Sequence, residues 1–130
     1  MKRHVISHIA IYLLSIVMAV FGIYHFMYPK EMMVYVPTFI PGGIIWVYFV
    51  GGAFILAAIA FIFNKRVQLA GYLLALLLLL FVFTIHLPTY LQGGTEETRH
   101  IALINLLKDT AIAAFALHIA GSADAKGIIF

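Results

Sequence analysis

The side chains best able to move a proton or hold a polar ligand lie inside the most apolar parts of this chain. Lys108 and Asp109 are neighbours in LINLLKDTAIAAFALHIAG, a segment long enough to cross a membrane, and Asn105 precedes them by about one helical turn. An ionisable group at such a depth costs about 2.5–3.5 kcal/mol on insertion scales. Helix neighbours diverge by about 100°, so Asn105 is expected to point between Lys108 and Asp109 on one broad face.

Histidines close two other apolar segments. His25 ends one of them in FGIYHF, one turn after Gly22, and His86 ends another in FTIHLP, two residues after Thr84. Imidazole donates hydrogen bonds, and it takes up and releases protons near neutral pH. Both histidines are expected near the same membrane face as Asn105. Groups from three helices are therefore expected to converge between facing helices, just below the interface.

This set of polar residues predicts a site for a ligand that exchanges protons. Either histidine can act as hydrogen-bond donor and proton acceptor, Asp109 can relay the proton, and Lys108 or Asn105 can bind a second ligand oxygen. The predicted catalytic residues are His25, His86 and Asp109, the predicted ligand-binding residues are Gly22, Thr84, Asn105 and Lys108, and no metal site is predicted.

A purely structural interpretation of the same residues stays open. Lys108 can extend its stem toward the headgroups, Asp109 can pair with it or with Asn105, and the histidines can be ordinary interfacial residues. For any one of these residues the structural interpretation is favoured. For the whole set a function is favoured, because intramembrane ionisable groups are expensive.

The composition requires a membrane protein. Of 130 residues, 65% are hydrophobic and 10% are charged, whereas soluble domains are near half apolar and a quarter charged. The chain has no cysteine, which excludes disulfides, thiolate metal sites and dithiol relays. The net charge of +3 is scattered, so no nucleic-acid partner is expected.

Four apolar segments are expected to be the transmembrane helices of one all-α domain covering residues 1–130. They are residues 5–27, 44–63, 67–87 and 100–120. At about 1.5 Å per residue each can cross a hydrocarbon core of about 30 Å, and the lack of water there requires helices. The first segment follows a basic start, but no signal-peptide cleavage pattern follows it, so we interpret it as a retained helix.

The basic residues predict the orientation of this four-helix bundle. Lys2, Arg3, Lys65, Arg66 and Lys126 fall on one side of the membrane, and only Lys30 and Arg99 fall on the other. The positive-inside rule then places both termini in the cytoplasm. Small residues four apart, such as Gly71/Ala75 and Ala116/Ala120, favour close helix packing.

Three motifs in order resemble the DoxX-like family of small membrane proteins. GIYHFMYPKEMMVYVPTFIP resembles that family's G-x-x-H-F-x-x-P opening, and IHLP and NLLKDTAIAAFAL resemble its third and fourth helices. By position the matching residues are Gly22, His25, Phe26, Pro29, Pro37, Pro41, His86, Pro88, Asn105, Lys108 and Asp109. Many relatives carry a glutamate in the second helix, where this chain reads GGAFILAA.

The resemblance implies a four-helix protein of the bacterial or archaeal inner membrane, associated with a quinol oxidase or another redox complex. The leading hypothesis is a quinone-linked accessory subunit, with quinone as its only expected cofactor and other membrane subunits or further copies of itself as partners in the bilayer. A non-enzymatic scaffold or assembly subunit is the second hypothesis, in which the polar groups join helices. An oligomeric transporter of small solutes is the third, and the sequence leaves open whether the protein is an enzyme.

Overall fold

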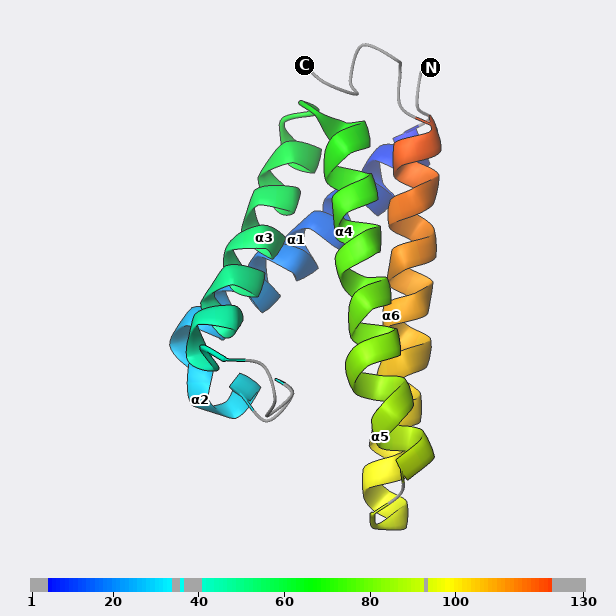
Figure 1. The fold of residues 1–130 in the computed structure, drawn as a ribbon. Coiled ribbons are helices and arrows are strands. Elements are labelled where there is room, and N and C mark those ends of the chain that lie inside the picture. The colour runs from blue at the N-terminus through cyan, green and yellow to red at the C-terminus, as the bar shows by residue number, and fades with distance from the viewer. Residues whose placement is uncertain (1–4, 34–35, 37–40, 93, 123–130) are drawn as a thin grey trace.

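The computed structural model describes residues 5–33, 36, 41–92 and 94–122, and within these ranges the only regular elements are helices. Four spans are long and apolar enough to cross a membrane (Figure 1): α1 (Val5–Met27), α3 (Ile44–Ile62), the continuous span Val67–Gln92, and α6 (Glu96–Ser122). A short helix, α2 (Pro29–Met32), follows α1. The prediction of an all-α, multi-pass membrane protein is confirmed.

The third span is not a uniform helix. It consists of α4 (Val67–Phe81), a π-helix η2 (Val82–His86) and α5 (Leu87–Gln92). It therefore continues beyond the predicted end at residue 87. Of the residues used to predict orientation and family, Lys2, Arg3, Pro37 and Lys126 lie outside the described ranges.

The fourth span begins four residues earlier than the sequence predicts. Thr95 precedes α6, and its hydroxyl accepts a hydrogen bond of 3.0 Å from the backbone N–H of Thr98. A threonine oxygen that satisfies an otherwise unpaired N–H of the first turn is an N-cap. Glu96 and Glu97 then stand in the first turn, where the positive end of the helix dipole stabilises carboxylates.

The helices pack as two pairs, α1 with α3 and α4 with α6. Figure 1 shows the pairs close together at the end where α1 begins and α6 finishes, and separating toward the end that carries α2 and α5. Glycines set both pairings. A Cβ on Gly22 would lie 2.7 Å from the carbonyl oxygen of Gly51, and one on Gly71 would lie 2.8 Å from that of Ala116. The predicted close approach through Gly71 and Ala116 is thus present between α4 and α6.

A tight turn joins the two pairs. It follows α3 directly and reaches α4 through Asn64, Lys65 and Arg66, with φ of 54° at Asn64 and 52° at Arg66. Both residues are in the left-handed region, which reverses the chain in few residues and is uncommon for residues other than glycine. The Lys65 N–H donates to the Ala60 carbonyl at 3.0 Å and closes the end of α3.

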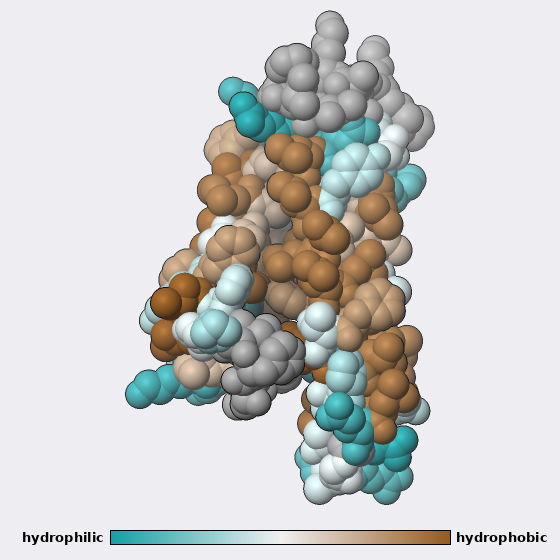
Figure 2. Space-filling view, in the orientation of Figure 1, coloured by the Kyte–Doolittle hydropathy of each residue, from teal (hydrophilic) through white to brown (hydrophobic). Residues whose placement is uncertain are grey.

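The buried core lies where the two pairs meet, and all four spans contribute to it. Its members include Met18 of α1, Phe54 and Phe61 of α3, Leu74 of α4 and Ala116 of α6. Most of the remaining surface is apolar (Figure 2), as lipid contact requires. This core fixes the relative positions of the helices that carry the polar residues.

Candidate functional site

The π-helix η2 carries two of the predicted site residues, and the proline that follows it explains its form. Pro88 has no N–H, and in a regular α-helix its ring would collide with the carbonyl of Thr84, four residues earlier. The helix widens before the proline, so that the N–H of Leu87 donates to the carbonyl of Val82, five residues back. Isolated π turns of this kind are frequent at functional sites.

Threonine hydroxyls supply additional hydrogen bonds around this irregular turn. Thr89 donates to the carbonyl of Ile85 at 2.7 Å, and Thr84 donates to the carbonyl of Leu80 at 2.5 Å. In a bilayer these carbonyls have no water to bond. Thr84 is exposed and its described hydroxyl bond lies within its own helix, so its observed role is to support the backbone of η2.

The structure brings His86 and Asp109 together, 23 residues apart in sequence. His86 Nε2 lies 3.0 Å from Asp109 Oδ2, and the two side chains are 9% and 19% exposed. Asp109 reaches this position because it shares a face of α6 with Ala102, Ala113 and Ala116, all buried. A carboxylate only accepts hydrogen bonds, so Nε2 of His86 is the donor in this contact.

The other two polar residues of α6 are arranged differently. Lys108 is exposed, and no ion pair joins it to any residue in the described ranges. Asn105 is half-buried. The acid therefore pairs with a histidine of the neighbouring span rather than with the adjacent lysine, as the divergence of helix neighbours requires.

His25 lies in the other helix pair. Its Nδ1 is 2.7 Å from the carbonyl oxygen of Phe21, so Nδ1 donates a hydrogen bond to that carbonyl. The ring is buried and packs edge-on against Phe21 and Phe54, with centroids 4.9 and 5.4 Å apart. Gly22 contacts α3 in the same pair, so its observed role is to let the two helices approach closely.

Aromatic rings connect the two pairs. Phe54 of α3 packs edge-on against His25 on one side and against Phe81 of α4 on the other, with centroids 6.5 Å apart for the second contact. Phe81 is the residue immediately before η2. The chain of rings therefore runs from His25 to the start of the turn that carries His86.

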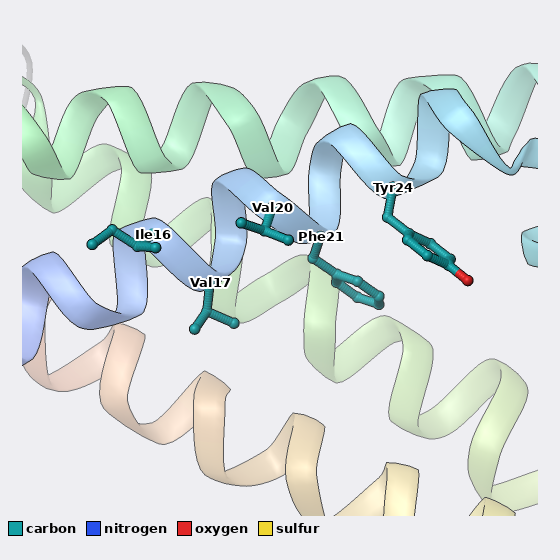
Figure 3. A pocket seen from close by; sticks show the side chains of 5 residues that line it. All are labelled: Ile16, Val17, Val20, Phe21 and Tyr24. Atoms are coloured by element: carbon teal, nitrogen blue, oxygen red, sulfur yellow. The ribbon is translucent and has the colours of Figure 1, made fainter.

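An open apolar groove of about 380 Å³ lies along α1. In the view of Figure 3 the side chains of Val17, Phe21 and Tyr24 lie on the side of α1 toward α4 and α6. Ile16 and Val20 complete the lining. The lining surface is entirely apolar, and the Tyr24 hydroxyl, which donates to Glu31 at 3.3 Å, does not contribute to the groove. Its volume is at the lower end of the range for small-molecule pockets.

Residues 14–120 match the model of a family described as a domain of unknown function, DUF8561. The chain belongs to this family. The matched DUF8561 region includes both helix pairs and every candidate residue, from Gly22 to Asp109. No curated protein and no solved structure matches the chain.

Sequence reasoning did not find the aromatic and hydroxyl groups of this region of the DUF8561 chain. Phe21, Phe54 and Phe81 are typical apolar residues of membrane helices, and no pattern distinguishes them from rings that face lipid. For Tyr24 the sequence contains only a weak indication of a role, which is its position next to His25 in GIYHF. The π turn is easier to predict, because the proline of IHLP disturbs the helix before it. That proline marks an irregular turn within the span rather than the end of the span.

Proposed function

We propose that this protein is a quinone-linked accessory subunit of a membrane redox complex, and that His86 and Asp109 exchange protons with the quinone. The observation that carries the proposal is the 3.0 Å contact between His86 Nε2 and Asp109 Oδ2 inside two membrane spans. Ionisable groups at this depth are costly and generally mark ligand or proton pathways.

The pair has the properties that proton exchange needs. Asp109 accepts the hydrogen of Nε2 and thereby orients the imidazole ring of His86. The carboxylate is the more exposed of the two, at 19% of its side chain, so a quinol hydroxyl can approach from the side and donate a hydrogen bond to it. A quinone supplies two carbonyl oxygens that become hydroxyls on uptake of two electrons and two protons. The electrons then belong to a partner subunit, since this chain contributes only acid–base groups.

The apolar part of the ligand has a suitable surface on α1. The groove along α1 is lined by aliphatic and aromatic side chains. Flat aromatic rings such as Phe21 stack well against a planar ligand. The groove is open along the helix, so an isoprenoid tail can enter from the lipid.

The proposal includes an orientation and a location. We infer that both termini are cytoplasmic, because Lys65 and Arg66 lie in the turn at the end of the molecule where α1 begins and α6 finishes. His86 then lies toward the outer half of a bacterial or archaeal inner membrane, and Asp109 lies at the middle of α6. The resemblance of GIYHF, IHLP and NLLKD to DoxX-like proteins supports this assignment and the association with a redox complex.

Quinone retention by the purified protein in lipid nanodiscs tests the proposal. A short-tailed ubiquinone and a menaquinone analogue serve as probes. His86→Gln and Asp109→Asn are expected to weaken binding roughly tenfold to a hundredfold, since hydrogen bonds involving charged groups contribute about 1.5–3 kcal/mol. His118→Gln changes an exposed histidine of α6 and is the matched control. Equal binding by wild type, His86→Gln and Asp109→Asn would remove the quinone function.

The same pair also supports a second candidate, a scaffold or assembly subunit. His86 and Asp109 connect the third span to α6, and interhelical polar contacts in membranes contribute about 1 kcal/mol. Asp109→Asn separates the two candidates because it keeps the size of the side chain and removes its charge. A scaffold loses stability or assembly in this variant, whereas a redox subunit still assembles and loses turnover.

A further inference from the structure

The least apolar of the four spans is also the least covered by the rest of the protein. In α6 17% of the most apolar window is buried, against 22%, 39% and 33% in the other three spans. Polar residues in membrane helices normally face the interior of the bundle. The combination of low hydropathy and little burial in α6 indicates that another molecule covers part of this helix.

The uncovered side of α6 includes a charge. Lys108 is exposed and lies about 18 Å from the beginning of α6 and about 21 Å from its end, by the helical rise. The charged first turn of α6, which ends near His100, lies about 12 Å along the helix from Lys108. The lysine stem covers part of that distance, so its charge lies below the headgroups rather than among them. No residue of the described ranges pairs with it. A negative charge on another molecule would therefore stabilise it at this depth.

The residues around Lys108 permit a close neighbour. Ala111, Ala114, His118 and Gly121 follow it at helical spacing, and all four are exposed. We call Lys108 and these four residues the outer face of α6. A Cβ on Gly121 would meet nothing within 4 Å. Small side chains let a second helix backbone approach closely in the half of α6 that follows Lys108, while Ile104 and Leu107 are the large exposed residues beside it.

A second copy of the chain does not supply the missing charge. A two-fold interface would place the outer face against itself and bring two Lys108 side chains together. The membrane-embedded acid of the described spans is Asp109, and it is paired with His86 on the opposite side of α6. A lipid headgroup would have to leave the membrane surface to reach Lys108 at mid-helix.

We propose that the outer face of α6 binds a transmembrane helix of a different protein, and that this helix carries an aspartate or glutamate at the depth of Lys108. The attraction between the two charges is strong in the low-dielectric membrane interior and fixes the register of the two helices. This inference goes beyond the proposed function and stands whether or not the protein binds quinone.

Site-specific crosslinking in native membranes tests the inference. The chain has no cysteine, so Ala114→Cys introduces a single thiol to which a short photoreactive group can be attached. We expect one discrete adduct with another protein, whose crosslinked peptide is a hydrophobic segment containing Asp or Glu. Leu13→Cys, on the exposed face of α1, is the control and should give no discrete adduct.

Charge variants in the Ala114→Cys background complete the test. Lys108→Met should reduce the adduct by about tenfold or more, while Lys108→Arg should retain it. The helix content of Lys108→Met, measured by circular dichroism, checks that the variant folds. A self-adduct, adducts with lipid alone, a partner segment without an acid, or a yield unchanged in Lys108→Met would each overturn the inference. Quinone retention is measured separately, so its failure and the failure of this inference are distinguishable.

Discussion

Two adjacent glycines of α3 test how closely α1 and α3 pack, through the difference in stability between alanine substitutions at the two positions. A Cβ on Gly51 would lie 2.8 Å from the Cβ of His25, 3.0 Å from the carbonyl oxygen of Gly22 and 3.1 Å from Cε2 of Phe26. A Cβ on Gly52 would meet nothing within 4 Å. Gly51→Ala and Gly52→Ala therefore make the same chemical change at sites that differ in available space.

The expected magnitudes follow from these distances. Replacing a helical glycine by alanine stabilises the folded state by about 0.5–1 kcal/mol at both sites. At Gly51 the new methyl group must gain about 0.7 Å or more to reach an ordinary carbon–carbon separation. Overpacking of this kind costs about 1–3 kcal/mol. The propensity gain cancels in the comparison, so Gly51→Ala should be less stable than Gly52→Ala by about 1–3 kcal/mol.

Reversible unfolding in mixed micelles, followed by circular dichroism, measures this difference. The free energy of unfolding should rise slightly for Gly52→Ala and fall for Gly51→Ala. Equal stability of the two variants, or greater stability for Gly51→Ala, would show that α1 and α3 do not pack closely at Gly51. The position of His25 inferred from the same packing would then also be wrong.

Three further predictions concern the second helix pair. Gly71→Ala should destabilise the protein by about 1–3 kcal/mol in the same unfolding assay because its Cβ would meet α6, while Gly121→Ala, in open space, should be neutral or slightly stabilising. Pro88→Ala restores a backbone donor and should convert η2 toward α-helix, which a shift in the NMR signals of the His86 ring would report; unchanged signals would contradict this. Gln68→Met removes a favourable hydrogen bond to α6 and, with it, a buried amide oxygen that has no partner. These two effects oppose each other, so the free energy of unfolding should change by less than about 1 kcal/mol, and a larger loss would contradict the prediction.

The sequence predicts the helices of this protein well because the membrane leaves few alternatives. Hydrophobic length alone places α1 and α3 to within one residue, since an apolar segment of twenty residues in lipid has to be helical. The errors lie where polar chemistry matters. The end of the third span was placed at the proline of IHLP, and the start of α6 was placed after its threonine cap.

The candidate site is less predictable, because it depends on how the helices are rotated about their axes. The sequence identifies His86 and Asp109 as expensive polar residues, and helix periodicity separates Asp109 from Lys108. Whether His25 or His86 lies against Asp109 depends on which helices pack together. That choice follows from contacts such as Gly51 with α1 and Gly71 with α6, and a single sequence does not specify partners for small residues.

The turn between α3 and α4 has a mechanical consequence for the whole molecule. Residues 64–66 are the covalent link between the two helix pairs, and the left-handed conformations of Asn64 and Arg66 set the direction in which α4 leaves α3. The α3 arm extends about 28 Å from this pivot and the span Val67–Gln92 about 39 Å, so a rotation of 10° would move their far tips by about 5 Å and about 7 Å. A rotation of about 10° at the turn would thus displace the ends that carry α2 and α5 by roughly one helical turn.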